Sequence, residues 1–236
     1  MARLKLSVLA IGLASACSAA RPAQSGVQLG AFLFQGESIP YALFVPSAHG
    51  RGQPLPTLLL LHGARGNGPE FMPLWQAFAE TNGIVLVAPT LSLTAAQETH
   101  VTELLPALLD AALAGLILDP KRTYAFGFSA GGYFAYDAAT LLSTRFAAVA
   151  VFGMIIAPEY RWIVAQARRK TPIAIYIGDR DQFSTLDQTR ATRDLLLNHG
   201  FPVHYVELPN QDHAYARVSQ AVNEDAWKFM SQTSLP

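Results

Sequence analysis

Short apolar runs alternate with stretches at helical spacing along most of the chain. Runs rich in β-branched and apolar residues predict strands at Val27–Gln35, Tyr41–Val45, Thr57–Leu61, Ile84–Ala88, Thr123–Gly127, Ala147–Val151, Ile173–Ile177 and Val203–Leu208. Apolar residues three and four positions apart predict helices near Pro69–Thr81, Gln97–Ala114, Ala130–Leu142, Tyr160–Arg169, Thr185–His199 and Ser219–Gln232. Near-continuously apolar strands are typical of a sheet covered on both faces. The alternation therefore predicts an α/β fold with a mostly parallel sheet of about eight strands between two helical layers. The first strand is expected to pair with the second as an antiparallel hairpin across Gly36-Glu37.

Residues 1–20 have the pattern of an export signal. Arg3 and Lys5 precede an apolar run that ends near Ala16, and this run of about 11 residues is shorter than the roughly 20 that span a membrane. Two cleavage positions remain open. Cleavage before Cys17 resembles lipoprotein processing, in which that cysteine is lipidated, and cleavage after Ser18-Ala19-Ala20 would release a soluble protein. We expect an exported protein that is periplasmic or extracellular. Lipidation of Cys17 would be its only contact with a membrane.

The composition of the whole chain excludes several classes of protein. Of the 236 residues 51% are hydrophobic and 14% are charged, which excludes intrinsic disorder. The 17 basic residues equal the 17 acidic ones, so no basic excess predicts a nucleic-acid partner. A single cysteine excludes an intrachain disulfide. Residues 21–236 contain no repeat and no low-complexity linker, and we expect one domain without a large lid.

Ser129 is the candidate nucleophile. Gly127-Phe128-Ser129-Ala130-Gly131 fits the pattern Gly-x-Ser-x-Gly, and it lies between an expected strand and an expected helix. In that context the serine stands on a sharp turn with its hydroxyl exposed, and the glycines let strand and helix approach closely. The start of a helix also favours developing negative charge. The alternative is that Ser129 is an ordinary helix-capping serine.

His213 is the candidate general base, because a serine hydroxyl needs a neighbouring imidazole to take its proton. It follows the last expected strand, at the carboxyl edge where catalytic groups of open α/β sheets collect. His204 lies inside that strand and His199 ends a helix, so both are weaker candidates. His213 is otherwise an exposed loop histidine.

Asp181 is the candidate acid that orients the imidazole. It lies after the strand at residues 173–177, in Gly178-Asp179-Arg180-Asp181, at the same edge of the sheet. Asp181 is preferred because it stands further into the loop. Asp179 and Asp187 remain alternatives, Asp179 also fitting the role of a turn former beside Arg180.

Two backbone N–H groups are expected to form an oxyanion hole. One is that of Ala130, which follows the nucleophile, and the other comes from the loop at residues 61–68. Ala64 is preferred in this loop and Arg65 is the alternative, whereas His62 is expected to brace the loop. Several aromatic side chains are candidates for an acyl pocket or for simple packing: Phe128, Tyr133, Trp162, Phe183 and Tyr215.

Four motifs in this order resemble the α/β-hydrolase superfamily: Leu61-His62-Gly63, Gly127-Phe128-Ser129-Ala130-Gly131-Gly132, Gly178-x-x-Asp181 and Asp212-His213. The segment at residues 118–124 and the turn after it are similar to the polyhydroxyalkanoate depolymerase and feruloyl esterase group, and the size is similar to compact carboxylesterases. The resemblance implies a serine esterase that cleaves small-molecule carboxylic esters through an acyl-enzyme, with no metal or other cofactor.

Other activities remain open at this stage. A thioesterase, peptidase or acyltransferase would use the same three side chains. A non-catalytic envelope lipoprotein would use the fold only as a binding scaffold, because a fold does not by itself establish a function.

Overall fold

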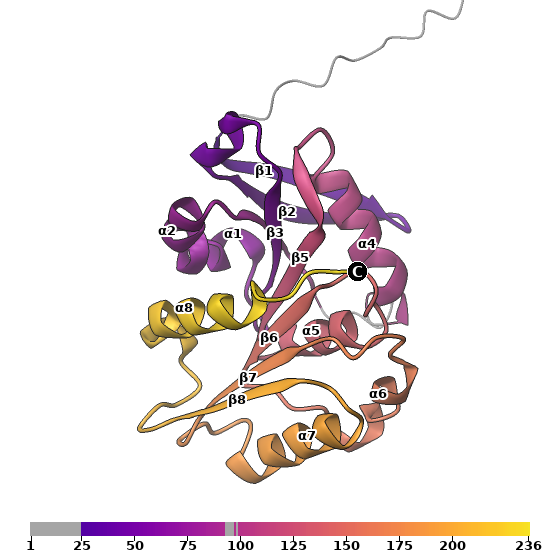
Figure 1. Cartoon of the computed structure of the whole chain (residues 1–236), viewed down its shortest axis with the longest axis vertical. Coiled ribbons are helices and arrows are strands. Elements are labelled where there is room, and N and C mark those ends of the chain that lie inside the picture. Colours follow the sequence, from indigo (N-terminus) through magenta and orange to yellow (C-terminus); the bar gives the residue numbers. More distant parts are fainter. Residues whose placement is uncertain (1–24, 93–96, 98) are drawn as a thin grey trace, which may run out of the picture.

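The fold is described by a computed structural model that covers residues 25–92, 97 and 99–236 (Figure 1). The expected signal sequence and Cys17 lie outside the described residues. The strands are β1 Gly26–Phe34, β2 Glu37–Val45, β3 Leu55–Leu61, β4 Val85–Pro89, β5 Leu118–Phe128, β6 Ala148–Phe152, β7 Ile173–Gly178 and β8 Val203–Leu208. The described α-helices are α1 Gly68–Phe71, α2 Pro73–Asn82, α4 Val101–Ala112, α5 Gly131–Ala139, α6 Ile163–Gln166, α7 Leu186–Asn198 and α8 Ser219–Met230. Three short 3₁₀ helices are η1 Ser47–Arg51, η2 Pro158–Tyr160 and η3 Tyr215–Arg217.

All eight strands form one sheet in the order β1-β2-β4-β3-β5-β6-β7-β8. β2 is antiparallel to both β1 and β4, and every pair from β4 to β8 is parallel. The parallel strands therefore end together at one edge, which is where residues 62, 129, 179 and 209 leave the sheet. The structure confirms the predicted fold class.

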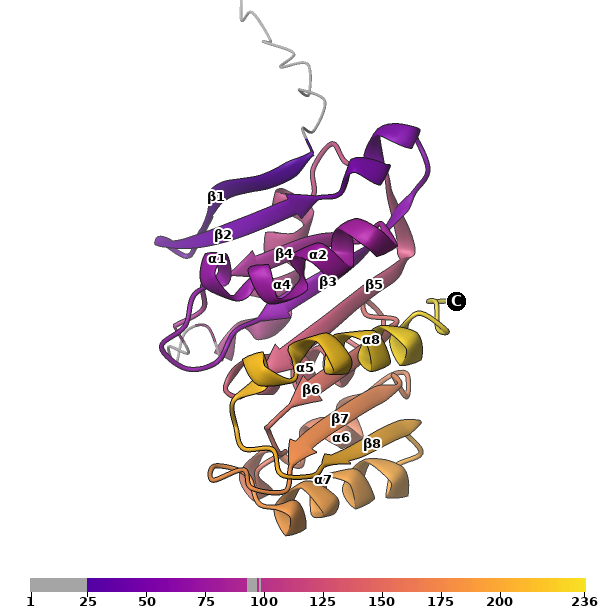
Figure 2. The same cartoon turned by 90° about the vertical axis from the view of Figure 1, so that its left-hand side faces the viewer.

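The antiparallel hairpin is also present, but its turn lies one residue earlier than expected. β1 ends at Phe34, and the two-residue loop consists of Gln35 and Gly36, with φ angles of 48° and 87°. Two positive φ angles are typical of the hairpin turn whose twist matches the twist of the paired strands. β1 is thereby placed at one edge of the sheet, with β8 at the other (Figure 2).

Helices cover both faces of the sheet. α1, α2 and α8 lie on one face, and α4, α5, α6 and α7 lie on the other (Figure 1). Alternate residues of a strand point to opposite faces of the sheet. In β3, Leu58 and Leu60 pack on the side of α1, α2 and α8, and Leu59 and Leu61 pack on the side of α4 to α7. Burial of each of these Leu side chains stabilises the fold by about 1.5–3 kcal/mol, so both helical layers help to hold the strands, and the loops at their ends, in place.

Two predicted helices differ from the structure. The stretch at residues 69–81 forms two helices, because Pro73 has no N–H to continue the first one and instead begins the second. The stretch at residues 160–169 is α-helical only over residues 163–166, because the N–H groups of Arg168 and Arg169 donate to the hydroxyl of Ser143 instead of continuing the helix.

In the described part of the chain, no helix combines the length and the apolar composition that crossing a bilayer requires.

Candidate active site

Ser129 stands on a tight turn between β5 and α5. Its φ angle is 49°, a left-handed value that is uncommon outside glycine. Its N–H donates to the carbonyl of Phe152 at 2.9 Å, which extends the pairing of β5 with β6 by one residue. A Cβ at Gly127 would lie 2.5 Å from the carbonyl oxygen of Gly131, and a Cβ at Gly131 would lie 2.2 Å from that of Leu61. Both positions therefore require glycine, which explains the spacing of the motif.

Three side chains from three loops meet at this turn. The Nε2 atom of His213 lies 2.7 Å from the Oγ atom of Ser129, and its Nδ1 atom lies 2.6 Å from Oδ2 of Asp181. A carboxylate only accepts hydrogen bonds, so Nδ1 carries the proton and donates it to Asp181. Nε2 is then free to accept the proton of the serine hydroxyl, which is the arrangement that general-base catalysis needs.

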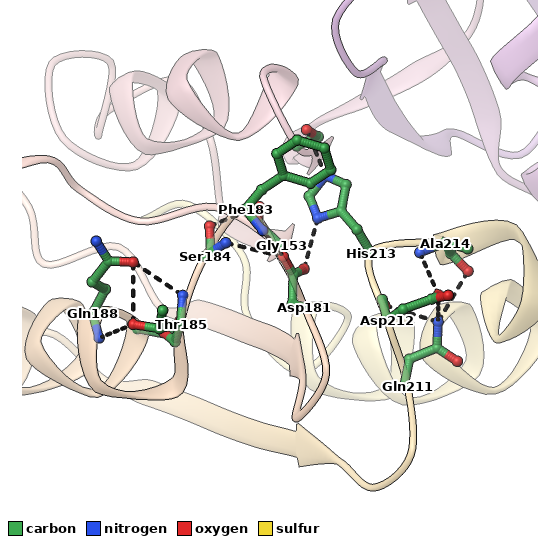
Figure 3. Close-up of polar contacts among 12 residues, drawn as sticks. Gly153, Asp181, Phe183, Ser184, Thr185, Gln188, Gln211, Asp212, His213 and Ala214 are labelled. Atoms are coloured by element: carbon green, nitrogen blue, oxygen red, sulfur yellow. Dashed lines mark hydrogen bonds and ion pairs between the residues drawn. The ribbon is translucent and has the colours of Figure 1, made fainter.

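Asp181 is held so that its charge faces the imidazole. Its side chain is fully buried, and the side chain of His213 is 11% exposed. The other carboxylate oxygen, Oδ1, accepts the N–H groups of Phe183 at 2.8 Å and Ser184 at 3.0 Å (Figure 3). The carboxylate thus receives hydrogen bonds on both oxygens, which fixes its orientation and offsets the cost of burying its charge.

Gly153, just after β6, was not singled out from the sequence. Its φ angle is 68°, and a Cβ there would lie 2.8 Å from Cε1 of His213 and 3.2 Å from Oδ2 of Asp181. Any larger residue would push the imidazole away from the carboxylate. The signal available in the sequence is a glycine directly after a buried strand that neighbours the nucleophile strand, although many glycines outside active sites share that pattern.

The two loops that hold His213 and Asp181 are hydrogen-bonded to each other. The N–H of Asp179 donates to the carbonyl of Leu208 at 3.0 Å, and the N–H of Arg180 donates to the carbonyl of Gln211 at 2.9 Å. These bonds continue the pairing of β7 with β8 beyond the ends of both strands, and they keep Asp181 in register with the His213 loop.

The His213 loop is further fixed by its own side chains. The Nε2 atom of Gln211, a buried residue, donates to the carbonyls of Asp212 at 2.9 Å and Ala214 at 3.1 Å (Figure 3). Oδ1 of Asp212 accepts the N–H of Ala214 at 2.9 Å, and Oδ2 accepts from Arg217 at 2.6 Å. The N–H of Ala214 and the cation of Arg217 hold the pKa of Asp212 below its usual range. Gln211 has no sequence pattern that predicts this role.

His62 braces the loop after β3. Its Nε2 atom accepts the N–H of Leu91 at 3.0 Å, so Nδ1 carries the proton and donates to the carbonyl of Gly63 at 2.7 Å. Burial lowers the pKa of His62, and the hydrogen bond to Gly63 opposes this only in part. The side chain is therefore a neutral brace between two loops at neutral pH.

The same loop lies against the nucleophile. A Cβ built at Gly63 would lie 3.3 Å from Cβ of Ser129. In the described part of the chain, the N–H groups of Ala64, Arg65 and Ala130 donate to no protein acceptor. Free N–H groups are what an oxyanion hole requires, but the choice between Ala64 and Arg65 stays a prediction.

The other candidate residues lie elsewhere. Nδ1 of His199 bonds to the carbonyl of Leu195 at 2.8 Å, and Nε2 of His204 bonds to Asp225 at 2.7 Å. The side chain of Asp187 is 95% exposed on α7 and pairs with Arg190. The structure therefore brings Ser129, His213 and Asp181 together, and it places His199, His204 and Asp187 elsewhere, whereas Asp179 is an exposed residue.

A cavity of about 800 Å³ runs beside α5. It is lined mainly by apolar and aromatic side chains, including Tyr133, Tyr160 and Trp162, but not by Ser129, His213 or Asp181. Of its lining residues, Tyr133 stands four positions after the nucleophile candidate in the sequence. In the described ranges, no group of three or more His, Cys, Asp or Glu side chains has the arrangement of a metal site.

Comparison with protein families gives one match that covers most of the chain. The dienelactone hydrolase family matches residues 51–233, which include Ser129, Asp181 and His213. Among curated proteins, the chain is 29% identical over 167 residues to the bifunctional acetylxylan esterase/xylanase XynS20E of Neocallimastix patriciarum. That match covers 65% of this chain but only 23% of the relative, so the chain corresponds to less than a quarter of that protein.

Solved structures show the same fold at low sequence identity. S-formylglutathione hydrolase from Agrobacterium tumefaciens is 20% identical, with a TM-score of 0.69 over 89% of this chain and 95% of that one. FphF, a fluorophosphonate-binding serine hydrolase of Staphylococcus aureus, is 14% identical, with a TM-score of 0.73 over 88% of this chain and 99% of that one.

Proposed function

The chain belongs to the dienelactone hydrolase family, and we propose that it is a serine esterase that cleaves small-molecule carboxylic esters with Ser129 as the nucleophile. The family and its neighbours support hydrolytic activity in general. The observation that most directly supports the finer proposal is the continuous hydrogen-bond chain from the Ser129 hydroxyl through His213 to the buried carboxylate of Asp181.

In the first step, Ser129 Oγ attacks the ester carbonyl carbon while Nε2 of His213 takes the hydroxyl proton. The resulting imidazolium is stabilised by the Asp181 carboxylate that accepts from Nδ1. The negative charge on the carbonyl oxygen is stabilised by the N–H of Ala130 and by that of Ala64 or Arg65. The C–O bond to the alcohol then breaks, and His213 gives its proton to the leaving oxygen.

In the second step, water replaces the alcohol. His213 takes a proton from the water as its oxygen attacks the acyl carbon, and then returns that proton to Ser129 Oγ as the acid leaves. The enzyme is thereby restored, and no metal or organic cofactor takes part in this scheme.

Hydrolysis of p-nitrophenyl acetate tests the proposal. The acetylxylan esterase named above makes acetyl esters a reasonable first series. Ser129→Ala is expected to lower kcat by at least about 10³-fold, because loss of a nucleophile removes the whole acyl-enzyme route. Ser231→Ala, which alters an exposed serine at the end of α8, is the matched control and is expected to keep wild-type rates. Wild-type turnover by Ser129→Ala would refute the role of Ser129.

We also propose that the enzyme is exported, from the pattern of residues 1–20 described above. Intact-mass measurement of the protein from membrane and soluble fractions distinguishes lipidation at Cys17 from cleavage after Ala20. Recovery of uncleaved protein in the cytoplasm alone would contradict export.

A further inference from the structure

We propose that Phe183 forms the surface against which the alcohol half of the ester binds, so that the enzyme prefers esters of aromatic or other large apolar alcohols. This inference rests on the proposed function, since it uses His213 as the group that protonates the leaving oxygen.

Phe183 is an exposed aromatic ring at the candidate base. The residue is 71% exposed, and its ring centroid lies 4.7 Å from that of His213, with the two ring planes at 60° (Figure 3). Isolated exposed apolar side chains are common and need no explanation by themselves. This one is distinguished by its contact with the imidazole.

Hydrogen bonds fix the backbone on both sides of Phe183. The N–H of Phe183 donates to Oδ1 of Asp181, and the next residue, Ser184, donates to the same oxygen and through its hydroxyl to the carbonyl of Gly153 at 3.3 Å. Thr185 then caps the start of α7 in a reciprocal capping box with Gln188. The segment is thus anchored on both sides of Phe183, and this anchoring keeps the side chain next to the imidazole that its ring contacts.

The imidazole has two further close neighbours, Phe128 and Gly153. The ring of Phe128 lies 5.1 Å from that of His213, and Gly153 approaches Cε1 so closely that even a Cβ would not fit. Of the two phenylalanine rings that contact the imidazole, Phe183 is the exposed one, so it is the ring that a bound ligand can reach.

The chemistry places the alcohol in this region. During acylation the bond between Ser129 Oγ and the acyl carbon forms, the bond from that carbon to the alcohol oxygen breaks, and the proton passes through His213 to the alcohol oxygen. That oxygen must come within about 3 Å of Nε2, so the carbon attached to it lies within about 5 Å of the imidazole, as Phe183 does. During deacylation the alcohol has left and water occupies its place. Phe183 should therefore affect acylation in proportion to the size of the alcohol, and should not affect deacylation.

The test compares two acetate esters that form the same acetyl-enzyme, benzyl acetate and ethyl acetate, in the wild type, Phe183→Ala, Phe183→Leu and Phe183→Tyr. We expect Phe183→Ala to lower the ratio of kcat/KM for benzyl acetate to that for ethyl acetate by about three- to tenfold, the range typical of an aromatic contact. Phe183→Tyr, which keeps the ring, is expected to retain the ratio, and Phe183→Leu to fall between them. Leu197→Ala, which removes another exposed apolar side chain, on α7, serves as the matched control.

A second arm measures deacylation. The steady rate that follows the burst of p-nitrophenol from p-nitrophenyl acetate is expected to keep its wild-type value in Phe183→Ala. An equal fall for both acetates, or a slower deacylation, would overturn the proposal, because it would assign Phe183 to holding His213. A specificity change between acetyl and butyryl esters of one alcohol would overturn it in favour of an acyl contact. Failure of the proposed function would look different: the wild type would then hydrolyse neither acetate.

Discussion

At the scale of single residues, Gly153 sets how closely the imidazole can approach the Asp181 carboxylate. Gly153→Ala places a methyl group against His213 and adds strain at a positive φ angle. We expect kcat to fall about tenfold or more with little change in KM, because the imidazole is displaced and the substrate contacts are not. Steady-state kinetics with p-nitrophenyl acetate measures this.

The control for this prediction is Gly200→Ala. Gly200 also has a positive φ angle, 81°, but nothing lies within 4 Å of the Cβ that alanine would add. Both variants should lose about 1–3 kcal/mol of stability from backbone strain, but only Gly153→Ala should lose activity. Equal activity in the two variants would show that the contact with His213 is unimportant.

His62 makes stability depend on pH. Burial holds its pKa below the ordinary value of about 6.5, so just below that pH the unfolded chain binds a proton that the folded chain does not. The free energy of unfolding should therefore decrease as the pH falls below about 6.5, and this decrease should stop below the folded-state pKa.

Urea unfolding of the wild type and His62→Gln at about pH 7.5 and about pH 5.5 tests this prediction. The wild type should be the more stable protein at the higher pH, and its advantage should shrink at the lower pH because the variant lacks the titrating group. An advantage that is equal or larger at the lower pH would show that His62 is not buried in its neutral form.

A site residue can be predicted from the sequence when the residues next to it in the chain form a recognisable pattern. Ser129 stands out because the turn that exposes it needs glycines at fixed distances. His213 and Asp181 could be proposed because parallel strands bring their loops to one edge, which also explains why the choice between Asp179 and Asp181 could only be a preference. Gly153 acts through its close approach to His213 and Asp181, which lie on loops distant from it in sequence, and no local pattern predicts such a contact. The side chain of Gln211 acts within its own loop, on Asp212 and Ala214, but that loop has no sequence motif that marks a glutamine for this role.

At the scale of elements, tertiary hydrogen bonds decide where some helices end. The side chain of Arg169 donates to three carbonyls after α5, those of Ser143 at 3.0 Å, Phe146 at 2.5 Å and Ala147 at 2.7 Å. The sequence at residues 160–169 has helical spacing, but it does not reveal these distant acceptors. The prediction of a full helix was therefore wrong there, although the strands on either side were placed correctly.

Arg169→Ala should lower the free energy of unfolding by about 2 kcal/mol or more, because it leaves these carbonyls without their charged donor. Activity at low temperature should be retained, since Arg169 makes no contact with Ser129, His213 or Asp181. Urea unfolding measures the loss, and Arg169→Lys should recover part of it. A variant as stable as the wild type would show that water replaces the guanidinium without cost.

At the scale of the whole molecule, the two edges of the sheet differ. β1 has nine residues without a charge or a proline, and Leu29 and Leu33 on its outer face are 74% and 70% exposed. β8 has six residues, and its Glu207 pairs with Arg190 at 2.7 Å. Natural edge strands are commonly protected from pairing by charges, prolines or short length, so β1 is the unprotected edge of the described sheet.

We therefore expect concentrated wild-type protein to self-associate through β1, and Leu29→Lys combined with Leu33→Lys to reduce this association without loss of esterase activity. Light scattering at increasing concentration measures the effect, and Leu197→Lys on α7 is the control for added charge. Equal association of the double variant and the control would exclude β1 as the contact.

The overall architecture could be predicted because burial on both faces leaves a strong pattern in every parallel strand. The order of the strands in the sheet could not be predicted, because it depends on where each connection returns the chain to the sheet and not on the pattern of any one segment. The paired loops beyond β7 and β8, which bring the acid to the imidazole, are a consequence of that order.

The account depends most on the reactivity of Ser129, and reaction with a fluorophosphonate followed by intact-mass measurement and peptide mapping tests it most directly. We predict one adduct per chain, located on Ser129, absent in Ser129→Ala and formed much more slowly in His213→Ala and Asp181→Asn. An adduct on another residue, or undiminished labelling of Ser129→Ala, would contradict the account.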